Sequence, residues 1–250
     1  MPAEESTCAI VLRARDYAES DRIVTLLTRD FGKLSGIAKG AKASRRRFER
    51  KLEPFSHVTL FFRRRPHGQL VFITRAEAGD LPPLALEHDL VRFALGSYML
   101  EVAETLTSEE AEAAGAYHVL AESLRMLTTS DATIAARQGF EMAILRATGF
   151  GLEFSYCRAC DMPVGPAESA YFVAGRGGIV CPRCRPAAPE TAVRLTPASI
   201  AALARLNAAA IAEHAALEHG GSDGAQALAR FLASVLDRKL RSAAFLDSML

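Results

Sequence analysis

The pattern of apolar and polar positions in the first 80 residues predicts short β-strands, which in residues 8–14 show the two-residue period of a half-buried strand. In the first such stretch, residues 8–14, Cys8, Ile10 and Leu12 fall on one face of the expected strand. Four further stretches are predicted at residues 22–28, 34–39, 55–62 and 69–75. Five short strands with a long insertion after the third favour a small, partly open β-barrel of the OB type. Another small barrel or a sandwich fits the same strand count.

The connections between these strands contain turn-forming residues. Asp30–Lys33 predicts a hairpin in which Gly32 supplies a positive φ angle. Residues 63–68 contain Pro66 and Gly68 and predict the turn between the last two strands.

From Leu84 onward the apolar spacing becomes helical. We predict helices at residues 84–106, 114–127, 132–148 and 196–217, and a last helix with apolar positions from 228 to 240. Gly149 is the expected C-cap of the third helix, and Thr196 followed by Pro197 is an N-cap signal. This half of the chain therefore reads as a helical bundle, and the fold class as α+β.

Composition supports a division near residue 80. The 250 residues carry 30 Lys+Arg and 29 Asp+Glu, but residues 1–80 hold 16 basic and 10 acidic side chains, a net charge of +6. Residues 81–250 have a net charge of −5. We therefore expect a barrel domain at 1–80 and a helical domain at 81–250, with an insertion at about 150–190.

The sequence shows neither a membrane-spanning segment nor a secretion signal. The sequence has no run of 18 apolar residues and its N-terminus lacks the features of a secretion signal, so a cytoplasmic protein without membrane partners is expected.

Four of the five cysteines form two Cys-x-x-Cys pairs, Cys157/Cys160 and Cys181/Cys184. Two such pairs supply the four thiolates of a tetrahedral zinc site, and four sulfur ligands leave no position open for catalysis. The residues between the pairs read as a β-hairpin around Gly177–Gly178. Two disulfides are the alternative, which a cytosolic location disfavours. We predict a structural Zn²⁺.

Basic residues are concentrated in two segments. The first runs from residue 39 to 51 and the second forms the turn after the fourth strand. Such clusters favour binding of a polyanion, because cations on phosphates release condensed counterions. Phe31, Phe48 and Phe61 are candidates for stacking on unpaired bases. The predicted DNA-binding residues are Lys39, Lys42, Arg45, Arg46, Arg47, Arg50, Lys51, Arg63, Arg64 and Arg65.

Catalytic motifs are missing from the sequence. It contains no P-loop, His-Glu-x-x-His or Gly-x-Ser-x-Gly motif, and no His-x-Glu precedes the cysteine pairs. We expect no enzyme activity and no small-molecule substrate.

Several segments together carry a family resemblance. They are Val11-Leu12-Arg13, Tyr17-x-Glu-x-Asp21-Arg22-Ile23-Val24, Phe31-Gly32-Lys33 leading to Ala38-Lys39-Gly40-Ala41, Leu52-x-Pro54-Phe55, and the paired cysteines enclosing Gly177-Gly178. In this order they resemble the RecO family of bacterial DNA repair proteins, across essentially the whole chain.

The resemblance implies an N-terminal OB domain, a helical C-terminal domain and a zinc-stabilised element within it. It implies a non-catalytic recombination mediator, active on DNA in the cytoplasm and nucleoid, that binds single- and double-stranded DNA and anneals complementary strands. With its partner RecR, such a protein helps load RecA onto strands coated by single-strand-binding protein (SSB), whose C-terminal tail the helical half is expected to receive.

Two other functions fit parts of the pattern. A protein-interaction scaffold would use the barrel to dock an acidic protein without annealing DNA. A zinc-dependent nuclease or deaminase would instead cleave or convert labelled single strands.

Overall fold

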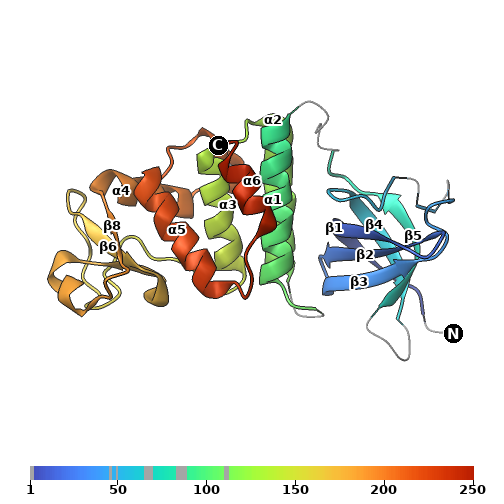
Figure 1. The fold of residues 1–250 in the computed structure, drawn as a ribbon, viewed down its shortest axis with the longest axis horizontal. Coiled ribbons are helices and arrows are strands. Elements are labelled where there is room, and N and C mark those ends of the chain that lie inside the picture. The colour runs from blue at the N-terminus through green and yellow to red at the C-terminus, as the bar shows by residue number, and fades with distance from the viewer. Residues whose placement is uncertain (1–2, 45–46, 49, 65–69, 83–88, 110–112) are drawn as a thin grey trace. The chain divides into compact units, whose positions relative to one another are not determined.

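The computed structural model describes residues 3–44, 47–48, 50–64, 70–82, 89–109 and 113–250. The chain forms two compact units, Met1–Thr129 and Ser130–Leu250. The first contains the barrel and two helices, and the second contains the remaining helices and a small sheet (Figure 1).

The five predicted strands are present and form a closed barrel in the order β1-β2-β3-β5-β4 (Figure 1). Their bounds are β1 Glu5–Tyr17, β2 Asp21–Thr28, β3 Gly32–Ala38, β4 His57–Arg63 and β5 Val71–Ala78. The OB-type barrel is therefore confirmed, but it is closed and not partly open. Closure comes from a parallel pairing of β3 with β5, Gly36 opposite Val71 and Ile37 opposite Phe72, which strand periodicity alone does not reveal.

The barrel interior is filled by alternate residues of all five strands. Leu26, Phe62 and Ile73 are fully buried there. The connection between β3 and β4 adds Phe48 and Leu52, at 3% and 1% exposure, to the same core. Because these two side chains anchor it, the described part of this polar and basic connection is held against the barrel.

The outer face of β1 and β2 is also buried. Ile10 and Leu27 pair across the two strands and are both 0% exposed, although neither belongs to the barrel interior. Helix α1 (Leu90–Leu106) contacts β1, and helix α2 (Ala114–Thr129) contacts β1 and β2. Asp89 caps α1 by accepting from the Arg92 N–H, while the predicted start at residue 84 lies outside the described residues.

In the second unit, helices α3 (Ile134–Ala147), α4 (Pro197–Ala208) and α5 (Gly221–Val235) pack against one another. A short helix, α6 (Arg241–Asp247), follows. The capping predictions hold: Gly149 has φ of +90° after α3, and the Thr196 hydroxyl accepts from Ser199 N–H at the start of α4.

Two predicted helices have different ends. The helix expected at 196–217 stops at Ala208, because Asn207 is held by Arg146 and by the Leu152 carbonyl, and Ala209 is extended. A 3₁₀ turn at Ile211–Ala216 follows. The last predicted helix begins earlier, at Gly221, and ends at Val235, after which residue 236 is extended.

A three-stranded sheet with the order β7-β6-β8 is formed by the insertion and the residues that directly follow it; β6 and β8 are labelled in Figure 1. Strands β6 (Ala170–Val173) and β7 (Gly178–Val180) form the predicted hairpin, joined by a 3₁₀ turn at Ala174–Arg176 and by Gly177 with φ of +60°. Strand β8 (Val193–Leu195) was not predicted, since three residues are too short for a periodic signal.

Candidate metal centre and nucleic-acid interface

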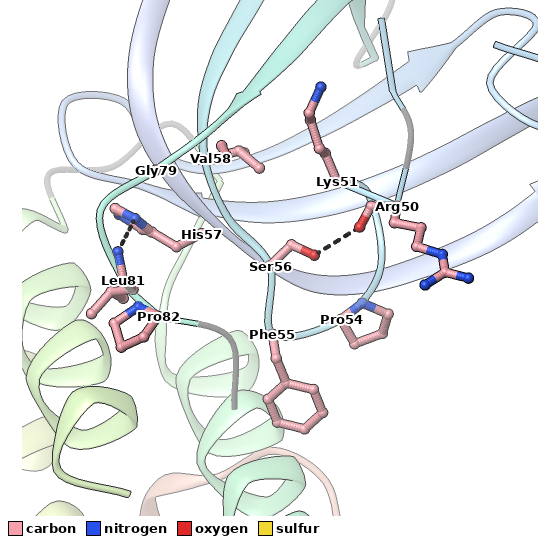
Figure 2. A pocket seen from close by; sticks show the side chains of 11 residues that line it. Arg50, Lys51, Pro54, Phe55, Ser56, His57, Val58, Gly79, Leu81 and Pro82 are labelled. Atoms are coloured by element: carbon pink, nitrogen blue, oxygen red, sulfur yellow. Dashed lines mark hydrogen bonds between the residues drawn. The ribbon is translucent and has the colours of Figure 1, made fainter. Parts of the chain in front are cut away.

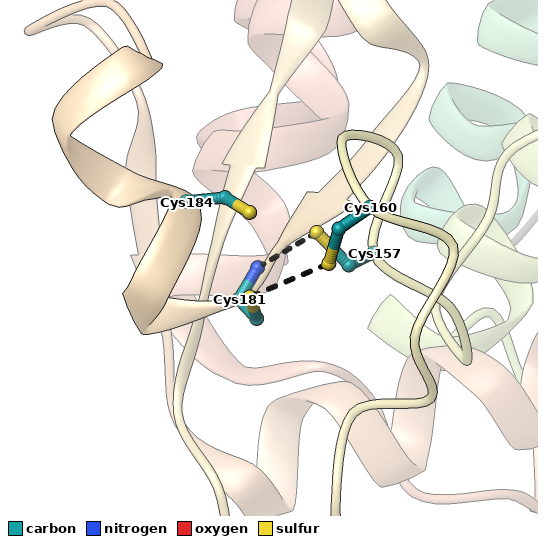
Figure 3. Close-up of side chains that lie close together, drawn as sticks. All are labelled: Cys157, Cys160, Cys181 and Cys184. Carbon is teal, nitrogen blue, oxygen red and sulfur yellow. Dashed lines mark hydrogen bonds between the residues drawn. The ribbon is translucent and has the colours of Figure 1, made fainter.

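The two cysteine pairs meet at one point in the insertion (Figure 3). Cys157 and Cys160 come from the loop before β6, Cys181 follows β7, and Cys184 lies in the 3₁₀ turn Pro182–Ala187. Their four sulfur atoms all lie within 4.8 Å of one another. The Sγ atoms of Cys160 and Cys181 are 3.9 Å apart. A tetrahedral site with Zn–S bonds of 2.3 Å needs about 3.8 Å between sulfurs, so the four residues fit a metal.

Local hydrogen bonds favour a thiolate at the centre of the cluster. Burial alone would raise the pKa of Cys157, but N–H groups of Cys181, Ala159 and Cys160 lower it to about 6. The Cys181 N–H lies 3.3 Å from the Cys157 sulfur. The neighbouring Cys160 and Cys181 thiols raise the pKa of Cys184 to about 12. Four thiolates at this spacing therefore need a cation to share their charge.

The first basic segment lies against the turn between β1 and β2. The Lys42 N–H donates to the Ser20 carbonyl at 3.0 Å, and the Gly40 N–H donates to Asp21 Oδ1 at 2.8 Å. The Lys42 ammonium lies 3.0 Å from Asp16 Oδ2. Hydrogen bonding from Lys42 is also the largest cause that holds the pKa of Asp16 below its usual value. The described parts of the segment and the turn therefore form one connected surface, which we call the basic end of the barrel: residues 16–22, 39–44, 47–48 and 50–56.

The basic side chains of this surface differ in how many contacts they make with the rest of the protein. The Arg47 guanidinium donates to the Lys39 carbonyl at 3.2 Å and stacks over Phe48. Lys39 and Arg50 are exposed, and neither forms an ion pair with any residue that the structure describes. Arg45 and Arg46 lie outside the described residues. Lys39 and Arg50 are thus the described cations best placed to meet phosphates.

Two hollows border Arg50. One, of 420 Å³, also includes Arg22, Lys42 and Ser44 in its lining. The other, of 310 Å³, is lined on one side by Lys51 and Ser56 (Figure 2). In Figure 2 the Phe55 ring points away from Lys51, and it packs near Phe93 of α1 with ring centroids 5.9 Å apart.

The second basic segment is elsewhere on the barrel. Arg64 lies 5.5 Å from the ring centre of Phe31, in the hairpin between β2 and β3. It also pairs with Glu5 at 3.3 Å, and Arg63 lies 4.0 Å from Glu4. Arg65 lies outside the described residues. The two basic segments are therefore at opposite ends of β2, about 23 Å apart for seven residue steps of a strand.

The aromatic candidates have different environments. Phe48 is 3% exposed inside the barrel core, so its prediction as a stacking platform is wrong. The Phe48 ring is part of the apolar core of the barrel, and the Arg47 guanidinium lies over it. Phe31 and Phe61 are partly buried, the first against Phe62 and the second beneath the Arg75 guanidinium. Tyr17, which sequence reasoning missed, is 52% exposed at the basic end; its place before a polar turn was the available signal.

The usual OB ligand surface is partly covered in this chain. OB folds commonly bind oligonucleotides on the outer face of strands 2 and 3 and on the adjoining loops. Here Lys33 of β3 donates through Nζ to the Glu104 carbonyl of α1 at 2.7 Å, and Ser35 donates to Glu109 at 3.3 Å. Residues of α1 and of the segment that follows it therefore contact part of this face.

Comparison with known families gives two matches that together span most of the chain. Residues 1–81 match the family model described as "Recombination protein O N terminal". Residues 87–244 match the model described as "Recombination protein O C terminal". Among the residues that the structure describes, no helix combines the length and apolar character of a membrane span.

Curated relatives cover nearly the full length. The chain is 39% identical over 247 residues to a protein of Anaeromyxobacter sp. (strain Fw109-5) named "DNA repair protein RecO", covering 96% of this chain and 94% of that one. A protein of the same name from Syntrophotalea carbinolica is 32% identical over 247 residues, covering 98% and 94%.

Proposed function

Because the chain belongs to the RecO family, we propose that it is a non-catalytic, DNA-binding recombination mediator in DNA repair, which binds single- and double-stranded DNA and anneals complementary strands. The observation that carries the proposal is the basic end of the barrel, where exposed Lys39, Lys42, Arg47 and Arg50 gather on one surface. The proposed DNA-binding residues are those predicted from the sequence: Lys39, Lys42, Arg45, Arg46, Arg47, Arg50, Lys51, Arg63, Arg64 and Arg65.

Annealing needs no catalytic residue. Two complementary strands repel one another through their phosphates, and this repulsion falls when protein cations neutralise both backbones. Cations at both ends of β2 would contact two stretches of backbone at once. Once bases pair, duplex stacking supplies the free energy that completes the reaction. Phosphate contacts also bind without reading sequence, as a general mediator requires.

The proposal includes protein partners and a metal. On the strength of family membership, RecR and the SSB C-terminal tail are the proposed partners in loading RecA, with the helical part receiving the tail. The four cysteines would hold a structural Zn²⁺, which when bound would cross-link the loop before β6 to the turn after β7. The proposed location is the bacterial cytoplasm and nucleoid.

The test is annealing of two complementary labelled oligonucleotides, with binding to each strand measured across salt concentrations. We expect faster annealing with protein than without it. The logarithm of affinity for single strands should fall by about 0.7 per phosphate contact for each tenfold rise in salt. The oligonucleotides recovered should be intact and unmodified.

Three other outcomes would contradict the proposed function, each in a different way. DNA binding without accelerated annealing would overturn the mediator and leave a DNA-binding module. No binding at low salt would favour a protein-interaction scaffold. Cleaved or deaminated strands would identify an enzyme.

A further inference from the structure

Tyr17 is the most exposed aromatic side chain among the described residues of the barrel. It is the last residue of β1, pairs in register with Asp21, and is 52% exposed. The next residue, Ala18, has φ of +52°, a conformation that alanine rarely adopts. Strained backbone of this kind is found at binding sites more often than elsewhere, because the surrounding structure must maintain it.

Neighbouring hydrogen bonds hold the turn after Tyr17 in place. The Lys42 ammonium donates to the Ala18 carbonyl at 3.4 Å and pairs with Asp16 on the other side of Tyr17. The Ser20 carbonyl accepts from the Lys42 N–H. The backbone next to the ring is therefore held by hydrogen bonds, so less backbone entropy is lost when a ligand binds.

Two exposed cations lie near Tyr17 in the register of the sheet. Arg15 and Tyr17 lie on the same face of β1, since side chains alternate along a strand, and Arg15 is exposed. Exposed Lys39 follows Ala38, which pairs with Arg22, so Lys39 lies one strand beyond Asp21, the partner of Tyr17. An exposed aromatic ring with cations nearby matches the chemistry of a nucleotide in an unpaired strand, with its base on the ring and its phosphates on the cations.

We infer that Tyr17 is a base-stacking residue, and that Tyr17 and the turn that follows it form a subsite for one unpaired nucleobase of single-stranded DNA. The inference rests on the proposed function, because it places a base within the DNA-binding surface described above. A base inside a duplex is already stacked on both sides. Tyr17 therefore favours single strands over duplex, whereas the surrounding cations bind both.

The first test compares Tyr17→Ala with Tyr17→Phe. One lost stacking contact is worth about 1–3 kcal/mol, which is about a 5- to 150-fold weaker affinity for single strands. Affinity for duplex should change less than twofold, and the salt dependence should match that of the parent protein because no phosphate contact is lost. Tyr17→Phe keeps the ring and should retain parental affinity. Tyr156→Ala is the matched control, since Tyr156 is 53% exposed in the cysteine-containing insertion.

The second test uses the absence of tryptophan from the sequence. Tyr17→Trp introduces the chain's single tryptophan, whose emission should be quenched by single-stranded oligonucleotide and little affected by duplex. The emission of Tyr156→Trp should not change with either.

The outcomes distinguish failure of the Tyr17 subsite from failure of the proposed DNA-binding function. If Tyr17→Ala binds single strands with parental affinity, or loses affinity for single strands and duplex equally, the stacking subsite is wrong while the proposed DNA binding is retained. If the parent protein binds no DNA at low salt, the proposed function itself fails.

Discussion

The Nε2 atom of His57 lies 2.7 Å from the hydroxyl oxygen of Tyr117, and this contact joins the first residue of β4 to helix α2. On the other side of the ring, Nδ1 accepts from the Leu81 N–H at 3.3 Å and lies 3.1 Å from Asp80 Oδ1. The side chain is 5% exposed. Burial lowers the pKa of His57 from its usual 6.5; the Asp80 carboxylate opposes this change and Arg125 adds to it.

The free energy of unfolding should therefore fall in mild acid. The unfolded chain protonates His57 near pH 6.5 while the folded chain still resists protonation, so stability is lost as the pH falls below 6.5. Buried His214, whose pKa is also lowered by burial, contributes in the same direction. Each histidine adds a slope of up to about 1.4 kcal/mol per pH unit. Unfolding measured between pH 5.5 and 8 checks this expectation.

Substitutions can show whether His57 causes the loss of stability in mild acid. His57→Gln should reduce the acid slope, and Tyr117→Phe should lose about 1 kcal/mol through its missing hydroxyl contact. His118→Asn, beside Tyr117 but exposed, should leave the slope unchanged. An unaltered slope in His57→Gln would show that the titration of this ring does not set the acid sensitivity.

Removing one cysteine of the cluster should release the proposed zinc. We expect Cys181→Ser to purify with less than one zinc per chain and to unfold at a lower temperature than the parent. A ligand at 1,000 times its dissociation constant contributes about 4 kcal/mol to stability, and that contribution disappears with the metal. Zinc content and thermal unfolding are the measurements.

Two comparisons make this result specific. Cys8→Ser removes the cysteine in β1 that lies outside the cluster, and should keep its zinc. DNA binding by Cys181→Ser should remain within about twofold of the parent, because the basic end belongs to the barrel. Soluble, metal-free protein with the parental melting temperature would contradict a structural role for zinc.

Removing Lys39 and Arg50, the two exposed cations that form no ion pair with the described residues, should weaken DNA binding through salt-dependent contacts. The double substitution Lys39→Ala with Arg50→Ala loses two phosphate contacts, so the salt slope for single strands should fall by about 1.4. A matched double substitution, Arg176→Ala with Arg183→Ala, removes two exposed arginines from the insertion and should leave the slope unchanged. An equal effect of both pairs would show that overall charge, and not this surface, controls binding.

Reversing Arg45, Arg46 and Arg47 to Glu is the stronger form of the same test. It should abolish binding at moderate salt. The lost contacts of Arg47 with the Lys39 carbonyl and the Phe48 ring should change thermal unfolding little, since Arg47 is exposed. Unchanged affinity would remove the basic segment from the interface.

Much of this architecture was predictable because it follows from local rules. Alternation located five strands, and the spacing of Cys157, Cys160, Cys181 and Cys184 located the sulfur cluster that the structure confirms. Turn chemistry placed Gly32 and Gly149, which both have positive φ. In each case, residues close in sequence determine the feature.

The predictions that were wrong share a different cause: these features depend on contacts between residues far apart in sequence. Phe48 looks like a stacking platform beside arginines, but its segment folds back so that the ring enters the barrel core. The helix expected to reach residue 217 ends at 208 because Arg146, 61 positions earlier, holds the Asn207 carbonyl. Closure of the barrel between β3 and β5 has the same long-range origin.

Gly36 shows what this closure requires, and gives a last prediction. It lies opposite Val71 where β3 meets β5. A Cβ atom added at Gly36 would lie 2.7 Å from Ile73 Cγ1 and 2.9 Å from Val71 Cγ2. Ile73 is fully buried among other core side chains, so neither it nor the paired backbone can move aside freely. Gly36→Ala should therefore lose about 1–3 kcal/mol of stability by overpacking.

The control for Gly36→Ala is Gly175→Ala, where a Cβ atom would meet nothing within 4 Å. It should unfold within about 0.5 kcal/mol of the parent. Chemical denaturation of both variants, followed by circular dichroism, supplies the comparison. Equal stability of Gly36→Ala and the parent would mean that β3 and β5 can separate enough to admit a methyl group. The barrel would then be held mainly by its four antiparallel pairings, β1 with β2, β1 with β4, β2 with β3 and β4 with β5.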